Sequence, residues 1–407
     1  SLQDTLPPFT RKSSTQGLED GSHIFEAVGL LIGMEEVPIE KQSEYLSALL
    51  APLCQQVTIL LSNAQVQDLA GSAACLQQVI SAINSLSKGF GERLATTSRP
   101  AVGNMFEQTL NVLLQVLLAF PKNNLLRSKV ISFIHRMVDT LGIAVFPHLP
   151  KAMEQLLVES EPKEMVEFLV LVNQLICKFK AAMTGILEEV FPFIASRVFA
   201  ILPKDGIPTG PGSNTEEIRE LQELQRIFFT FLHAVTSNDL SAVFLLPNNF
   251  GYLNELIQLL ISAACGHKDI LVRKACVQVF IKLIKNWCTR SNEDEKVPGF
   301  RNFIIQNFAA ACCFYSVIDT TFDFRDAHTI TLFGDIVCAQ KVIYEKCGDD
   351  FLLHLAMNIF PATQCPQDLA EQYCLELQRS DVKVLKDIYK SLVERLRMLQ
   401  NGIMAFR

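Results

Sequence analysis

The sequence is poor in charge and in tryptophan, and it contains no apolar run long enough to cross a membrane. Of its 407 residues, 49% are hydrophobic, 19% are charged and one is Trp. The most apolar stretch, residues 110–120, contains Asn111 and Gln115 and is stopped by Pro121, short of the ~18 residues that a span needs. We therefore expect no membrane insertion. Helices that are each covered by several neighbours explain the hydrophobicity better.

Catalytic and cofactor-binding motifs are absent from the sequence. It has no G-x-x-x-x-G-K-[ST] phosphate loop, no G-x-G-x-x-G, no H-E-x-x-H and no G-x-S-x-G. The seven histidines stand apart from one another, and Cys177 beside Lys178 has no neighbouring base. The sequence therefore predicts no catalytic residue, no metal site and no cofactor, and we expect a protein that is not an enzyme.

Neither a secretory signal nor a disulfide pattern is present. The N-terminus is polar and carries Pro7-Pro8 where a signal would have an apolar segment. The twelve cysteines form no C-x-x-C pair and are scattered, so we expect thiols that pack as small core residues in a reducing compartment. The first apolar helix has no polar capping repeat before it, which predicts a C-terminal fragment of a longer array.

The most informative segment is residues 267–285, HKDILVRKACVQVFIKLIK. Apolar residues recur in it at helical spacing and form one stripe: Val272, Cys276, Val279, Phe280, Leu283 and Trp287. Asp269 in the turn, followed by Val272 and Arg273 at the helix start, is typical of a HEAT-type helix pair. In such arrays we expect the Asp and Arg of stacked repeats to pair in a ladder.

Amphipathic helical segments follow one another along the chain, and none shows the alternation of a strand. The predicted helices span 22–34, 38–61, 71–89, 100–119, 123–141, 143–158, 162–180, 183–202, 214–236, 250–264, 269–287, 299–317, 325–347, 349–360, 366–378 and 381–399. The triplet Val145-Phe146-Pro147 recurs as Val190-Phe191-Pro192, 45 residues later (190 − 145), which lies within the HEAT period. Each Pro is expected to bend an outer helix. The sequence thus predicts an all-α, HEAT-repeat superhelical solenoid.

The array is predicted to occupy residues 22–399, with a flexible lead-in over 1–21 and a tail over 400–407. Two loop insertions are expected, a Gly- and Pro-rich one at 203–215 and a charged one at 288–298. The first insertion ends in Asn214 or Thr215, and either residue would cap the helix that follows.

Acidic residues outnumber basic ones, 43 to 36, and the net charge of −7 taken alone argues against a nucleic-acid binder. The polar rows of several second helices are nevertheless basic, and we expect second helices to line the concave side. Local field rather than net charge governs contact with a phosphate backbone, although a solvated face is the simpler interpretation. The loop over residues 88–99 adds further basic residues. The candidate RNA-binding residues are Lys88, Arg93 and Arg99 of this loop, and Lys129, Arg136, Lys178, Lys274, Lys282 and Lys285 of the helices.

Six segments together resemble a known family. They are SHIFEAVGLLIG (22–33), FIHRMVDTLG (133–142), LVNQLICKFK (171–180), FLHAVTS (231–237), HKDILVRKACVQVFIKLIK (267–285) and VKVLKDIYKSLVERLR (382–397). The chain from about Ser22 to its last helix is similar to exportin-T, the tRNA exportin of the importin-β (karyopherin) superfamily, and above all to plant members of that family. The resemblance implies a HEAT solenoid that wraps around tRNA and recognises shape and backbone rather than sequence.

The resemblance also implies a nuclear export receptor that carries mature tRNA together with Ran-GTP, contacts nuclear pore proteins, and shuttles between nucleus and cytoplasm. The principal Ran-binding repeats of the family are N-terminal and are expected to be absent from this chain. Individual tRNA contacts of the family follow no transferable motif, so the nine basic candidates depend on charge alone. The alternative is a HEAT-repeat scaffold or importin-like carrier that binds only protein partners.

Overall fold

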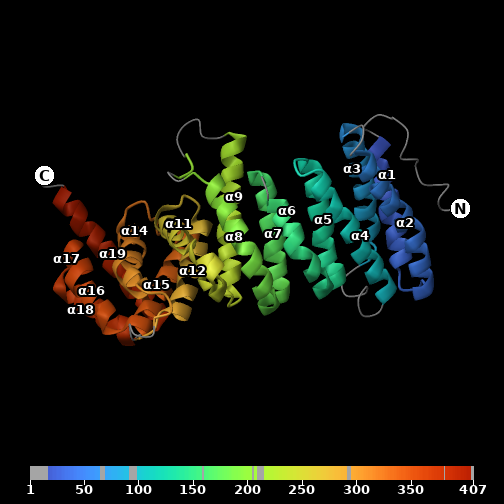
Figure 1. Cartoon of the computed structure of the whole chain (residues 1–407). Helices are drawn as coiled ribbons and strands as arrows, with labels where there is room; N and C mark the ends of the chain where they lie inside the picture. The colour runs from blue at the N-terminus through green and yellow to red at the C-terminus, as the bar shows by residue number, and fades with distance from the viewer. Residues whose placement is uncertain are drawn as a thin grey trace. The chain divides into compact units, whose positions relative to one another are not determined.

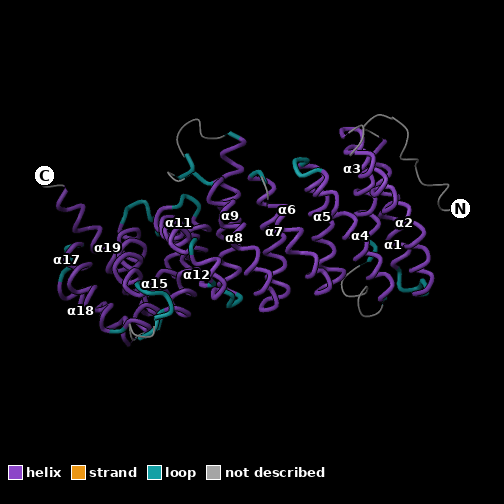
Figure 2. The backbone as a smooth tube through the Cα atoms, viewed as in Figure 1, coloured by secondary structure: helices purple, strands orange, loops and turns teal. Residues whose placement is uncertain are grey.

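The computed structural model describes residues 17–64, 69–90, 99–157, 160–203, 206–208, 215–290, 295–379 and 381–404. Every regular element within these ranges is a helix, and none is a strand (Figure 1, Figure 2). The predicted all-α fold is therefore confirmed. Residues 1–16 of the predicted lead-in, residues 405–407 of the predicted tail and Asn214 lie outside the described ranges.

The chain divides into two compact units, residues 1–224 and 225–407. The helices of the first unit are α1 (Gly17–Gly33), α2 (Ile39–Ala64), α3 (Leu69–Ser87), α4 (Pro100–Ala119), α5 (Asn124–Leu141), η3 (Gly142–His148), α6 (Leu149–Leu157), α7 (Pro162–Phe179), η4 (Lys180–Met183) and α8 (Thr184–Ile201). They form two layers. Helices α1, α3, α5 and α7 pack side by side in the first layer, and α2, α4, α6 and α8 pack in the second.

Helix α9 (Glu216–Ser237) leads into the second unit. The elements that follow are η5 (Ser241–Leu245), α10 (Pro247–Phe250), α11 (Leu253–Gly266), α12 (Ile270–Trp287), α13 (Phe300–Phe303), η7 (Ile304–Tyr315), α14 (Ser316–Ile318), α15 (Ala327–Cys347), α16 (Asp349–His354), η8 (Leu355–Ile359), α17 (Phe360–Ala362), α18 (Gln367–Arg379) and α19 (Val382–Met404). Helix α15 packs between α12 and α19, while α11 and α16 pack against the π-helix η7. This unit thus repeats the two-layer arrangement.

Side-chain caps fix where several helices begin. The Asn123 side chain accepts from the Leu126 amide, Asp269 accepts from Leu271, and Asp326 accepts from Thr329 at 2.7 Å. Each cap satisfies an amide at the helix start that has no carbonyl partner within the helix. Thr215 plays the same role for α9, since its hydroxyl lies 3.3 Å from the amide of Ile218. The expectation of a cap at this position is confirmed for Thr215.

The sixteen predicted helices all correspond to observed helical segments, but the repeated triplet does not behave as expected. Pro192 lies inside α8, whereas Pro147 lies in the 3₁₀ segment η3. The two copies therefore do not bend equivalent helices. The elements η5 and α10 were not predicted, because four or five residues are too few to display a helical period.

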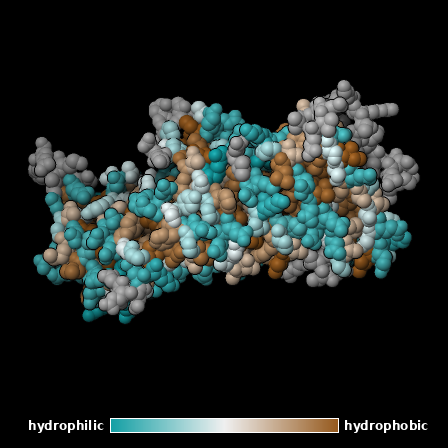
Figure 3. Space-filling view, in the orientation of Figure 1, coloured by the Kyte–Doolittle hydropathy of each residue, from teal (hydrophilic) through white to brown (hydrophobic). Residues whose placement is uncertain are grey.

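Two helical stretches are long and apolar enough to cross a membrane by length and composition, Ile39–Asn63 and Asn124–Leu157. Core helices of soluble proteins pass the same test. The second stretch comprises α5, η3 and α6, and its two α-helices lie in different layers of the unit. On the face shown in Figure 3, apolar and hydrophilic residues are intermixed. The absence of membrane insertion stays a prediction.

Candidate functional site

Basic side chains of the first layer in unit 1 make contacts between neighbouring helices. The Nζ of Lys88 lies 2.6 Å from Oε2 of Glu26 on α1, and this hydrogen bond lowers the pKa of the Glu26 carboxyl. The Nζ of Lys129 on α5 donates to the Ser81 hydroxyl on α3 at 2.6 Å, and burial lowers the pKa of the Lys129 ammonium. These two candidates therefore join helices of the array to one another.

A second set of polar contacts joins α5 to α7. His135 Nδ1 lies 2.6 Å from Oε1 of Gln174, and the Gln174 amide donates to the Asp139 carboxylate at 3.3 Å. Lys178 Nζ forms an ion pair with Oδ1 of Asp139 at 2.8 Å. Lys178 is exposed, yet a carboxylate already lies beside it. The predicted row of Gln174 and Lys178 is thus one side of a polar ladder between adjacent helices.

In unit 2 the corresponding row lies on α12 and faces α9 and α15. The amide of Gln278 donates to Oδ2 of Asp335 at 3.1 Å. Burial lowers the pKa of His233, a hydrogen bond with Gln278 raises it, and the charges of Lys282 and Lys274 lower it further. Burial has the opposite effect on the Asp335 carboxyl and raises its pKa, because in both groups burial disfavours the charged form. The half-buried Lys274 and Lys282 therefore lie close enough to His233 to influence its ionisation, and Lys274 also influences that of Asp335.

Four of the nine candidate cations are not paired with another described side chain and so could contact a ligand. Arg136, Lys274, Lys282 and Lys285 form no hydrogen bond or ion pair with any described residue. Arg136 is half-buried on α5, and Lys285 is exposed on α12. The three lysines lie along one helix at i, i+8 and i+11, so they lie toward the same side of the helix. We call Lys274, Lys282 and Lys285 the α12 lysine row.

The remaining two candidates are Arg99 and Arg93. Arg99 is only 5% exposed, and its guanidinium donates to the carbonyl of Gly33 at 3.3 Å. It occupies the N-cap position of α4 and ties this helix end to the end of α1. Arg93 lies outside the described residues. Arg99 therefore does not belong to the cations that lack a partner among the described residues.

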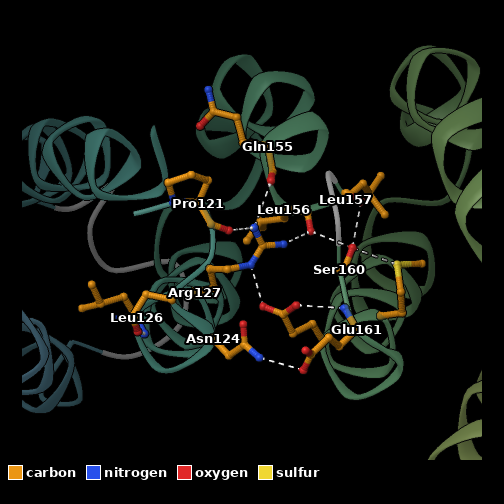
Figure 4. Close-up of polar contacts among 12 residues, drawn as sticks. Pro121, Asn124, Leu126, Arg127, Gln155, Leu156, Leu157, Ser160 and Glu161 are labelled. Carbon is orange, nitrogen blue, oxygen red and sulfur yellow. Dashed lines mark hydrogen bonds and ion pairs between the residues drawn. The ribbon is translucent and has the colours of Figure 1, made fainter. Parts of the chain in front are cut away.

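An extensive polar cluster in unit 1 surrounds Arg127, a residue that the sequence did not single out (Figure 4). Its Nε donates to Oε1 of Glu164 at 2.5 Å, and Nη1 donates to the carbonyl of Pro121 at 2.7 Å. Nη2 donates to the carbonyl of Leu156. Because Arg127 is 2% exposed, all of its donors must find partners inside the protein. The cluster therefore joins α5 to α6 and α7 through hydrogen bonds and one ion pair.

The predicted Asp–Arg ladder at Asp269 and Arg273 is wrong. Asp269 caps its own helix, while Arg273 donates to the carbonyl of Ala264 at 3.2 Å and to the hydroxyl of Ser316 at 3.3 Å. The Arg273 guanidinium also lies 5.5 Å from the centre of the Phe322 ring. One carbonyl, one hydroxyl and an aromatic ring, rather than a carboxylate, thus satisfy this buried cation.

Arg273 and Arg127 share a position that could have revealed their roles. Each is the fourth residue of its helix, directly after a pair of apolar residues, in LLRSKV and LVRKAC. Arg301 and Arg397 extend the pattern of buried arginine contacts, since they donate to main-chain carbonyls of Cys347 and Val317. Arginine suits these places because its planar group offers five donors.

The described residues contain no group of three or more His, Cys, Asp or Glu side chains that could hold a metal ion. All twelve cysteines are free thiols, and five of them are buried: Cys276, Cys288, Cys312, Cys313 and Cys347. Burial raises the pKa of the Cys276 thiol. A thiol with a raised pKa is a poor nucleophile, because the thiolate is the reactive form.

Comparison with known proteins agrees with the family suggested by the six sequence segments. The Exportin-T family model matches residues 9–397. The whole chain aligns with Exportin-T of Arabidopsis thaliana at 59% identity and with Exportin-T of Oryza sativa subsp. japonica at 51%, and it covers 42% of each relative. Exportin-T of Homo sapiens is 29% identical over 97% of the chain, which covers 41% of the human protein. The chain thus spans less than half the length of these relatives. Since the family match extends over nearly all of its residues, the chain belongs to the Exportin-T family.

Proposed function

We propose that this chain is the tRNA-contacting, C-terminal part of a nuclear export receptor that carries mature tRNA from the nucleus to the cytoplasm. Its membership of the Exportin-T family is the observation that carries the proposal. A transport receptor needs a surface for its cargo rather than a catalytic centre. The array of helices provides such a surface on the polar sides of α5, α7 and α12.

The geometry supports recognition of the tRNA backbone by cations that form no ion pair with another described residue. The α12 lysine row and Arg136 are the residues we assign to phosphate contact, since each lacks a hydrogen-bond or ion-pair partner among the described residues. Lysines on a helix contact phosphates as point charges and carry little sequence information. Folded RNA exposes phosphates and 2′-hydroxyls more readily than base edges. Recognition by shape and charge would therefore accept many tRNA species.

Ran-GTP is the second proposed partner, with its main site in a part of the receptor that precedes this chain. If tRNA and Ran-GTP both favour the same compact state of the receptor, each ligand raises the affinity of the other by an equal factor. GTP hydrolysis would then release tRNA in the cytoplasm. Contacts with nuclear pore proteins and shuttling between nucleus and cytoplasm complete the proposal. Neither step calls for membrane insertion, a cofactor or catalysis by this chain.

One observation favours the alternative, a scaffold that binds only protein partners. Lys88, Lys129 and Lys178 all contact other side chains of this chain, so in unit 1 part of the basic row serves the array itself. If substitution of Arg136 and the α12 lysine row also left RNA binding unchanged, the basic residues would only hold helices together or face solvent.

The function is tested by fluorescence anisotropy of several labelled tRNA species with the 407-residue chain, across a series of salt concentrations and with or without Ran-GTP. Binding of all species with a steep decrease of affinity at higher salt is expected, since four phosphate contacts correspond to a slope of roughly −3 to −4 in log affinity against log salt. A folded chain that binds no tRNA would favour the scaffold. Binding of a single species would contradict recognition by shape and charge.

A further inference from the structure

A pocket of about 360 Å³ opens in unit 2 between α15, α19 and the turn that precedes α15. It is lined by Phe324, Ile330, Phe333, Lys383, Lys386, Asp387 and Lys390. The volume falls within the range of sites that hold small molecules or single side chains of a partner. None of these residues belongs to the basic rows assigned above to RNA. The pocket is therefore a second candidate site on the chain.

The rim of the pocket is positively charged. Lys383, Lys386 and Lys390 follow one another at i, i+3 and i+7, so they share one face of α19. Lys383 is exposed and makes no hydrogen bond or ion pair with a described residue. Lys386 donates to the carbonyl of Ile330 at 3.3 Å. Asp387 is the single lining carboxylate, and the Nζ of Lys390 lies 3.9 Å from Oε1 of Glu394 next to the pocket. Three lysines against these two carboxylates leave an excess of positive charge.

The floor of the pocket is apolar, and its aromatic rings are already engaged. Phe333 is buried and stacks on Tyr389 with ring centres 5.3 Å apart, and it meets Phe324 at a right angle. The Arg397 guanidinium lies 5.0 Å from the centre of the Phe324 ring, and Lys390 lies 5.6 Å from it. Ile330 remains 39% exposed. The floor thus offers apolar contact but no vacant stacking platform of the kind that single-stranded nucleic acids use.

We propose that this pocket binds a short acidic segment of a protein partner. An apolar side chain of the segment would contact Ile330 and the phenylalanine floor, and flanking carboxylates would pair with Lys383 and Lys390. An apolar anchor surrounded by complementary charge is a common arrangement in peptide recognition. The engaged aromatic rings favour a peptide over RNA as the occupant.

The probe for this site is a fluorescein-labelled heptapeptide with a central phenylalanine and three glutamates on each side, titrated with the 407-residue chain. Saturable binding that weakens with salt is expected, because the rim contacts are ionic. Replacing the central phenylalanine by alanine should weaken binding by about tenfold, since burial of this side chain contributes most of the apolar contact. A probe that binds equally well without its phenylalanine would overturn the proposal.

The matched variants are Lys383→Glu/Lys390→Glu in the pocket and Lys151→Glu/Lys163→Glu on exposed positions of α6 and α7. Both pairs change the net charge equally. The pocket variant should weaken peptide binding by about tenfold or more, while the control should bind as the parent does and both variants should bind tRNA normally. An equal loss of peptide affinity in the two variants would show that net charge alone causes the effect, and it would overturn the proposal. Loss of tRNA binding in the pocket variant, or displacement of the peptide by a uridine decamer at equal concentration, would assign the pocket to RNA and overturn the proposal.

Discussion

The Nε of Arg127 donates to Oε1 of Glu164 at 2.5 Å, and this ion pair ties α5 to α7 with side chains only 2% and 9% exposed. The partners lie 37 residues apart in sequence, so the contact joins successive helix pairs of the array. Glu164 also accepts from the main-chain amide of Glu161 at the start of α7. A buried pair of this kind is costly to break, because each remaining charge stays away from water.

Substitution of Arg127 by Met should therefore destabilise unit 1. The change removes the guanidinium that donates to Glu164 and to the carbonyls of Pro121 and Leu156, and it leaves the buried Glu164 carboxylate without a countercharge. We therefore expect the free energy of unfolding to fall by about 3 kcal/mol or more. Chemical denaturation gives the overall loss, and amide hydrogen exchange should show faster opening of α5 and α7. Arg136→Met on the same helix is the control, since Arg136 has no hydrogen bond or ion pair with described residues. Equal denaturation midpoints for the two variants would contradict the role of the pair.

Close packing of α1 against the end of α3 gives a second prediction. A Cβ on Gly29 would lie under 3.0 Å from the carbonyl oxygen of Leu86, and one on Gly33 would lie equally close to that of Gly89. Alanine has the better helix propensity by about 1 kcal/mol, yet the clash with main chain should outweigh it and destabilise the protein by roughly 1–3 kcal/mol.

Gly185 on α8 is the matched control for these glycines, because a Cβ there meets nothing within 4 Å. Gly185→Ala should stabilise the protein by about 0.5 kcal/mol through helix propensity alone. The thermal unfolding midpoint should therefore rise for Gly185→Ala and fall for Gly29→Ala, relative to the parent protein. A gain in stability for Gly29→Ala would contradict the close approach of α1 to the main chain of Leu86.

The environment of His233 predicts how stability depends on pH. Burial lowers its pKa from the usual 6.5, and the charges of Lys282 and Lys274 add to the effect. As pH falls through 6.5, the unfolded chain binds a proton that the folded chain does not, so the contribution of His233 to stability falls. Asp335 contributes at lower pH and with the opposite sign. Because its pKa is raised from 3.8, the folded chain keeps a proton that the unfolded chain loses, so its contribution to stability falls as pH rises above 3.8.

NMR titration of His233 measures this directly. The midpoint should lie below 6.5, and Lys282→Ala should move it upward, since a repelling charge is removed. His233→Gln should abolish the corresponding part of the decrease in stability below neutral pH. A midpoint at or above 6.5, or one that Lys282→Ala leaves unchanged, would contradict the described arrangement of α9 and α12.

The helices were predictable because the signals for them are local. The predicted helix 100–119 coincides with α4, and the predicted 269–287 differs by one residue from α12, where Asp269 caps the start. Apolar spacing and capping residues act within a few turns of one helix, so the sequence displays them directly. The short elements η5 and α10 are held by their surroundings, and their few residues display no period.

The partners of the basic residues were not predictable, because they come from other helices. Lys178 meets Asp139, 39 residues earlier, and Lys88 meets Glu26, 62 residues earlier. A helical period identifies which residues share a face, but it cannot identify which face of which neighbour lies opposite. For the same reason Arg99 was expected on the surface, whereas it is buried against the end of α1.

The α12 lysine row provides the most direct test of the proposed function. Lys274→Ala, Lys282→Ala and Lys285→Ala are combined in one chain, with Lys151→Ala and Lys163→Ala combined as the control, and anisotropy with several tRNA species is measured across a salt series. If the three lysines contact phosphates, the variant should bind every species more weakly, and the slope of log affinity against log salt should become shallower by about 3. The control should keep the parent slope. An unchanged affinity and slope in the triple variant would contradict the assignment of this face to tRNA.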